Sequence, residues 1–265
     1  MRAKILFSGS LFLLICLPFQ SAYATESLFG HSFTTDTLPK NKWEVAQSYF
    51  GKFGKESGTY ASSLYRTQVE YGVTSFLQSS LYINTQHIYA NKNTASGSKF
   101  KFHSVSIENI LRLLSPYMDP VGAAVFFEPT LGPDQYALDQ RFIFQKNFKE
   151  DRLVIPLNIK LKLNWNKKDS RWDKKMEFEY TTGFLYRFIR NLSGGAEWRG
   201  AFNSPNFNPA DLHHAAYFLG PTLHYGARRF WATISVLFQL PVGGGRILGN
   251  EYEKIEVRAK TGYVF

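Results

Sequence analysis

The sequence predicts an all-β protein: a single antiparallel transmembrane β-barrel of about twelve strands, preceded by a cleaved signal peptide. Apolar and polar residues alternate with a period of two along most of the chain, as in strands with one apolar face. Aromatic residues, 17% of the chain, gather near the ends of these alternating segments. No run after residue 24 approaches the roughly 20 apolar residues of a membrane-spanning helix.

The first 24 residues have the parts of a secretory signal peptide. A short basic start leads into an apolar stretch over residues 5–19, and Ala22-Tyr23-Ala24 supplies the small residues that signal peptidase accepts. We therefore expect residues 1–24 to be removed, so that the mature chain begins at Thr25.

Cysteine and charge narrow the class further. Cys16 follows Ile15 instead of a small residue, which disfavours lipid attachment, and its removal leaves no cysteine for a disulfide or zinc site. The chain has a formal net charge of +10, and loss of Arg2 and Lys4 leaves +8. The basic residues are scattered without a nucleic-acid motif, so we expect no nucleic-acid partner and instead contact with anionic lipid headgroups.

The strands follow a periplasmic N-terminal segment, residues 25–42, and together form a barrel domain over residues 43–265. The expected strands cover 43–52, 60–73, 76–89, 102–114, 121–130, 136–146, 152–165, 172–188, 192–202, 214–225, 230–240 and 252–265.

Four segments show the alternation most clearly. Along 64–73 and 172–188, aromatic or aliphatic residues at every second position alternate with charged or small neighbours. In 153–165 all odd-numbered residues are apolar, and the last four even-numbered residues are polar, including Lys160. The same pattern ends the chain over 255–265. Short connectors alternate with longer polar ones, which is typical of a barrel with periplasmic turns and external loops.

A soluble secreted β-sandwich is the main alternative architecture. The expected strands are about 10–14 residues long, whereas soluble strands average about 5–6 and tilted spanning strands need about 9–11. Aromatic rings at two headgroup levels would explain the residues near strand ends. These are Trp43, Tyr71, Trp165, Trp172, Tyr186, Phe188, Tyr225, Phe230, Trp231 and Phe265. Length and aromatic placement therefore favour the membrane barrel.

The C-terminal strand resembles the assembly signal of Gram-negative outer-membrane proteins. Val257, Ala259, Thr261, Tyr263 and the terminal Phe265 share one face. The resemblance implies an outer-membrane location, contact with outer-membrane lipid, and recognition of Tyr263 and Phe265 by the barrel-assembly machinery. Five further stretches resemble a widespread family of outer-membrane barrels with no assigned activity: 38–44, 69–74, 114–120, 145–148 and 218–225.

Charged residues at inward positions are the candidate functional groups. By parity they are Arg66, Glu70, Glu108, Arg112, Glu128, Asp139, Arg141, Lys160, Lys162, Glu177, Glu179, Arg187, Glu197, Arg199, Glu256, Arg258 and Lys260. Such charges must pair or face water. They either fill the lumen as an ion-pair network or form a constriction for a small solute. We expect a narrow porin-like passive channel or a structural envelope protein.

Two other function classes remain open: an outer-membrane lipid hydrolase and a loop-based binding or adhesion protein. His87 and His103 lie at outward positions near the loop side, but Ser104 and Ser106 lie at inward positions, so local spacing forms no His–Ser pair. Adjacent side chains of His213-His214 point to opposite sides and are poor joint metal ligands. We therefore expect no catalytic residue, metal or cofactor.

Overall fold

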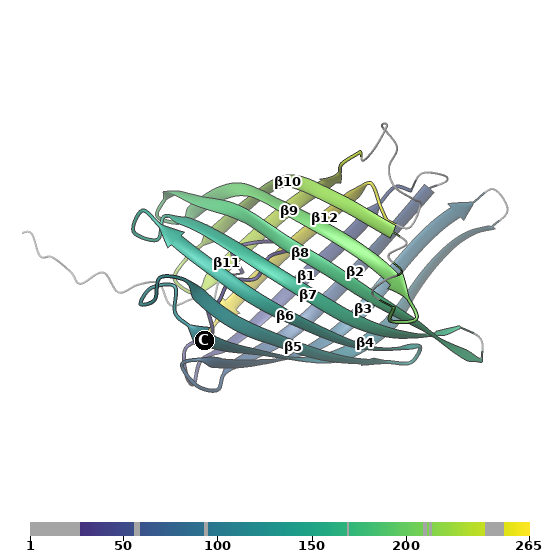
Figure 1. The fold of residues 1–265 in the computed structure, drawn as a ribbon, viewed down its shortest axis with the longest axis horizontal. Helices are drawn as coiled ribbons and strands as arrows, with labels where there is room; N and C mark the ends of the chain where they lie inside the picture. The colour runs from purple at the N-terminus through teal and green to yellow at the C-terminus, as the bar shows by residue number, and fades with distance from the viewer. Residues whose placement is uncertain are drawn as a thin grey trace, which may run out of the picture.

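A computed structural model shows one closed antiparallel barrel (Figure 1). The structure describes residues 27–55, 59–92, 95–168, 170–208, 211, 214–241 and 252–265. The expected signal peptide, His213 and the glycines at 243–245 lie outside these ranges. The described strands are β1 (Trp43–Phe53), β2 (Thr59–Gly72), β3 (Leu77–Lys92), β4 (Ala95–Leu114), β5 (Gly122–Gly132), β6 (Gln135–Phe148), β7 (Leu153–Lys168), β8 (Arg171–Ile189), β9 (Leu192–Pro205), β10 (His214–Gly226), β11 (Phe230–Gln239) and β12 (Ile255–Val264).

Every strand pairs with its neighbours in sequence, and β1 pairs with β12 to close the barrel. Glu44 lies opposite Val264 in this closing pair, so the start of β1 and the end of β12 meet at the short-turn end. Closure leaves no open strand edge, which a hydrocarbon environment would not tolerate. The predicted fold class is confirmed.

The β3–β4 hairpin is longer than the sequence pattern indicated, since β4 begins at Ala95 instead of near residue 102. A register shift between Asn84 and Thr85 places an extra residue, His103, in β4. The outward position expected for His103 assumed unbroken alternation along the strand, and this bulge interrupts it. Nε2 of His103 lies 2.7 Å from Nε2 of Gln135. Because a bulge interrupts the alternation of apolar and polar residues, the sequence pattern did not predict the outer part of the hairpin.

The outer face of the barrel is apolar and the inner face is polar. Phe142, Leu81 and Ile159 are 59%, 53% and 38% exposed, although such side chains are normally buried in soluble proteins. Lys160, the neighbour of Ile159, points to the lumen and is 9% exposed. This inverted distribution is the one that a surrounding lipid phase stabilises.

None of the described residues forms a helix long and apolar enough to cross a membrane.

Aromatic side chains mark both rims. Trp43 and Tyr71 pack at 4.4 Å between ring centroids near the short-turn end, and Tyr136 stacks on Trp172 at 5.0 Å near the long-loop end. Trp231 departs from the expected interfacial position. It is 1% exposed, and its indole N–H donates to Oε1 of Glu44 at 3.0 Å. Apolar and polar residues do not alternate clearly in β1, so the inward hydrogen bond between Trp231 and Glu44 was not predicted from the sequence.

Residues 27–38, in the segment before β1, lie inside the barrel. Residues 25–42 were expected to be periplasmic, but Phe29, His31, Thr35 and Leu38 are at most 1% exposed and contact inward-facing side chains. Residues 27–42 have no regular secondary structure, and the amides of residues 30–33, 35 and 38 donate to side chains of the barrel wall instead. Two of the three buried apolar clusters of the described residues lie where this segment meets the strands inside the lumen.

Candidate functional site

Residues 27–38, called the plug here, run into the lumen and return. Ser27 accepts a hydrogen bond from Nζ of Lys260 at 2.8 Å. The chain reaches its deepest point near His31, whose ring packs edge-on against that of Phe50 at 5.7 Å. It comes back to the short-turn end at Leu38, whose amide donates to Gln78 at 2.7 Å. Both ends of the plug therefore lie toward the short-turn end of the barrel.

The plug is held mainly through its backbone. The amides of residues 30–32 donate to the two carboxylate oxygens of Glu197 at 2.8, 2.8 and 3.0 Å. The amide of Phe33 donates to Oδ1 of Asn158 at 2.7 Å, and Nδ2 of Asn158 donates back to the Phe33 carbonyl at 2.9 Å. Hydrogen bonds to a charged acceptor are stronger than neutral ones, so Glu197 is the principal polar anchor.

Two phenylalanines provide the apolar contacts of the plug. Phe29 is fully buried and packs against Val154 and Leu185. Phe33 lies edge-on to Phe126 with 5.1 Å between ring centroids. Inward-facing apolar side chains would be exposed to water in an empty pore. Their presence opposite Phe29 and Phe33 shows that this part of the wall complements the plug.

Beyond the plug, charged side chains of the wall bridge the lumen. Arg199 donates to Glu179 through Nε at 2.7 Å and to Glu256 through Nη1 at 3.0 Å. Lys160 lies 3.2 Å from the same Glu179 carboxylate. All four side chains are at most 9% exposed, so they form a buried network instead of a freely hydrated ring.

The predicted lumen residues occupy positions of three kinds. Those that are buried are Glu70, Glu108, Glu128, Asp139, Arg141, Lys160, Glu179, Glu197, Arg199 and Glu256. Those that are partly buried are Arg66, Arg112, Lys162, Glu177, Arg258 and Lys260. Arg187 is exposed near a turn, where its guanidinium donates to the Asp151 carbonyl at 3.2 Å. The predicted assembly residues Tyr263 and Phe265 are 41% and 59% exposed on the outer face.

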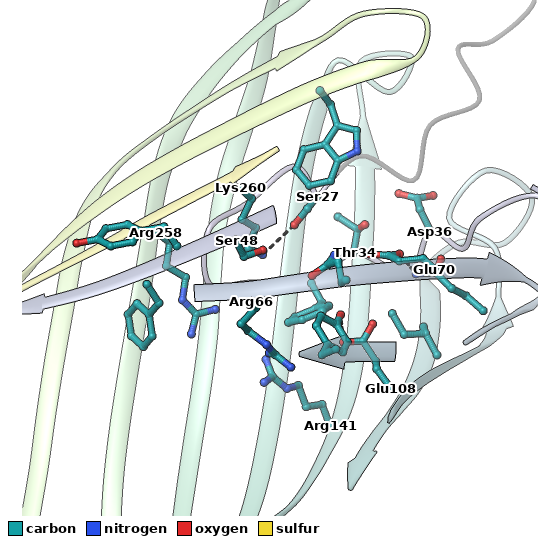
Figure 2. Close-up of a pocket in the computed structure, with 18 of the residues that line it drawn as sticks. Ser27, Thr34, Asp36, Ser48, Arg66, Glu70, Glu108, Arg141, Arg258 and Lys260 are labelled. Carbon is teal, nitrogen blue, oxygen red and sulfur yellow. Dashed lines mark hydrogen bonds between the residues drawn. The ribbon is translucent and has the colours of Figure 1, made fainter. Parts of the chain in front are cut away.

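A cavity of about 120 Å³ remains beside the plug (Figure 2). Plug residues Phe33 and Asp36 line one side of it, and side chains of β1 to β4, β6, β11 and β12 line the rest. Its lining includes Arg66, Arg141, Arg258, Lys260, Glu70 and Glu108. These six were all among the inward charges that parity predicted, whereas the contribution of the plug was missed.

Two ionisable plug residues lie in unusual surroundings. His31 is 1% exposed, and neither ring nitrogen has a hydrogen-bond partner among the residues that the structure describes. Burial lowers the pKa of His31 well below its usual value, and the nearby Arg258 and Arg199 cations lower it further. Burial raises the pKa of Asp36. Burial in the plug therefore shifts the protonation equilibrium of both side chains toward the neutral form.

Neither a metal cluster nor a catalytic triad stands out in the described part of the chain. No group of three or more His, Cys, Asp or Glu residues is arranged there to hold a metal ion. On the outer surface, Nε2 of His87 and the hydroxyl oxygen of Ser98 are 2.7 Å apart. Sequence spacing missed this pair because Ser98 lies across the β3–β4 hairpin.

The fold and the interior define a closed outer-membrane-type β-barrel whose polar lumen is occupied by its own N-terminal segment. The chain belongs to a family of unknown function, DUF6662, whose model matches residues 21–265. This confirms the resemblance to barrels without an assigned activity. A comparison with curated proteins found no match.

Solved structures share the barrel fold. The COG4313 outer membrane channel from Pseudomonas putida F1 matches with a TM-score of 0.65 and 10% identity over 87% of this chain and 98% of that chain. The NanC porin matches with a TM-score of 0.53 and 13% identity over 83% and 98%. LpxR from Salmonella typhimurium matches with a TM-score of 0.51 and 8% identity over 84% and 100%. These likenesses confirm the expected outer-membrane barrel architecture.

Proposed function

We propose that the protein is an outer-membrane passive channel for small polar solutes, closed at rest by the plug. The observation that carries the proposal is the charge-lined cavity of about 120 Å³ beside a plug that hydrogen bonds and apolar contacts hold in the lumen. A purely structural barrel needs a filled interior but no such cavity. The fold likeness to an outer membrane channel and a porin is compatible with this function.

Passage requires the plug to move, because it contacts walls on several sides of the lumen. Glu197 of β9, Asn158 of β7 and Gln78 of β3 each bind its backbone. These bonds can be exchanged for bonds to water, which makes the net cost of each broken bond small compared with its strength in isolation. The plug can therefore be displaced while the strand ladder stays intact.

Single-channel recording in planar bilayers tests the proposal. The full chain should conduct weakly, and a variant that lacks residues 27–38 should conduct severalfold more because the lumen is widened. Glu177→Gln serves as a control, since Glu177 faces the lumen and its ion-pair partner in the described residues is Lys175, outside the plug. A deletion variant that is correctly folded but does not conduct would contradict the channel and favour a structural envelope protein.

A lipid hydrolase is the second candidate, and the contact between His87 and Ser98 is the observation that favours it. A histidine within hydrogen-bond reach of a serine on a lipid-facing rim could activate the hydroxyl for attack on an ester. Among the described residues, His87 has its hydrogen-bond contact with Ser98 and forms no ion pair with a carboxylate that could orient it. Hydrolysis of phospholipid in mixed micelles that Ser98→Ala abolishes would establish this activity.

A further inference from the structure

Four charged side chains of the cavity wall that have no ion-pair partner among the described residues are separated by sign. Figure 2 shows Arg258 and Lys260 toward one side of the pocket and Glu70 and Glu108 toward the other. The basic pair belongs to β12, whereas the acidic residues belong to β2 and β4. The register places Glu70 and Glu108 at the same level, because both lie opposite Ser80 of β3. An acidic wall thus faces a basic wall across the cavity.

The basic side lacks acidic partners. Arg258 donates to the carbonyl of Gly30 at 3.1 Å, and within the described part of the chain its buried Nε has no hydrogen-bond partner. Lys260 donates to Ser27 and to the carbonyl of Phe29 at 2.8 and 3.2 Å. Neither cation forms an ion pair with any carboxylate in the described residues, so their positive charge is only partly balanced by plug carbonyls.

The acidic side is likewise served by neutral donors only. Side-chain amides of Gln68 and Gln78 donate to Glu70. The Tyr82 hydroxyl donates to Glu108 at 2.7 Å. Neither carboxylate has a cation within ion-pair distance among the described residues.

Two other cations that line the cavity have their charge balanced by an ion pair with a carboxylate. Arg66 binds Glu128 at 2.5 Å, and Arg141 binds Asp139 through two nitrogens at 3.0 and 2.8 Å. These guanidinium groups are already paired and have little to gain from a ligand. Among the strand residues that line the cavity, charge without an ion-pair partner therefore lies on the two facing walls. Partly buried unpaired charges are costly.

We propose that this cavity binds a small zwitterion, such as a free amino acid. Its carboxylate would face Arg258 and Lys260, and its ammonium group would face Glu70 and Glu108. One ligand then compensates both walls, which neither a simple anion nor a simple cation can do. The cavity of about 120 Å³ is several times the space of about 10–15 Å³ that one ordered water needs. The inference deepens the proposed function, on which it rests, by naming the solute class.

Binding is measured on the full chain in detergent micelles by titration calorimetry, with glycine as the probe. Acetate and methylammonium carry one of its two charges each and serve as matched ligands. Glycine should bind at least about tenfold more tightly than either. Lys260→Gln and Glu70→Gln should each weaken glycine about tenfold, which corresponds to the loss of one charged contact. Lys260→Arg should retain binding because it keeps the charge.

Lys162→Gln is the control, since Lys162 faces the lumen but does not line the cavity. Folding of each variant is checked by heat-modifiable migration, and if Lys260→Gln does not fold, the nearly isosteric Glu70→Gln carries the test. Equal binding of glycine, acetate and methylammonium, or an equal effect of Lys162→Gln, would overturn the inference. Conductance without glycine binding would refute only the solute class, whereas glycine binding without conductance would refute only the channel.

Discussion

The two halves of the lumen are filled by different means. Toward the short turns, the separate plug segment docks against inward apolar residues such as Phe126 and Val154. Toward the long loops, side chains of the wall itself meet across the lumen, as when Arg199 bridges Glu179 and Glu256. The plug can leave the lumen without a change in the barrel wall. The side chains of the wall cannot, because each is fixed to a strand.

This difference separates stability from occlusion. The charged network links β7, β8, β9 and β12 and so contributes to the integrity of the wall. Under the proposed function, the plug contributes mainly to whether the lumen is open. Variants in the two regions should therefore have distinct effects: network variants should lower the free energy of unfolding, and plug variants should raise conductance.

The largest expected effect concerns the network. Glu179→Gln leaves Arg199 and Lys160 without their shared carboxylate, and breaking a buried ion pair costs about 3–5 kcal/mol. Glu177→Gln should cost no more than about 1 kcal/mol, since Glu177 is a third exposed and lies 4.0 Å from Lys175. Urea titrations in lipid vesicles measure both. Equal losses for the two variants would contradict the special role of the buried network.

Phe33→Ala should have the next largest effect, and on the plug alone. It removes the ring contact with Phe126, which we expect to cost about 2–3 kcal/mol of docking free energy, less than for a fully buried phenylalanine. Amides of the plug should exchange faster with solvent while strand amides keep their protection. Phe142→Ala, on the outer face, is the control. Accelerated exchange in the strands as well would mean that the plug and the wall unfold together.

Deletion of Phe265 probes a residue outside both regions. The ring is 59% exposed on the outer face and contacts Tyr263 at 5.0 Å, so its loss should cost only about 1–2 kcal/mol. If the assembly machinery reads this residue, heat-modifiable barrel should fall sharply in cells, whereas purified protein should still refold into vesicles. Normal cellular assembly of the shortened chain would exclude that role.

The smallest effect is a dependence of plug docking on pH. The docked pKa of His31 is well below 6.5, so docking is fully stable above about pH 6.5 and weakens as the pH falls, because only released His31 is readily protonated. The weakening is at most about tenfold per pH unit. Charged groups around the ring are Arg258, Arg199, Glu179, Lys260 and Glu256. Conductance should rise between pH 7.5 and 5.5, and His31→Gln should remove this rise.

The sequence predicted the barrel well because alternation is a local property. The boundaries expected for β7 and β9 differ from those observed by no more than three residues. The plug could not be predicted in this way, since its binding depends on Glu197, Asn158 and Gln78 meeting in three dimensions. One signal was present: Val154 breaks the polar face of an otherwise regular strand. It faces Phe29 in the structure.

The hairpin path of the plug has a consequence for the order of assembly. Because the segment enters and leaves by the same end, it never threads through the barrel, and the pairing of β1 with β12 can be complete before docking. A newly closed barrel would then pass through an open, water-filled stage. The time for which a new barrel leaks solutes would then be set by the rate at which the twelve plug residues dock in the lumen. The rate of strand pairing would not determine it.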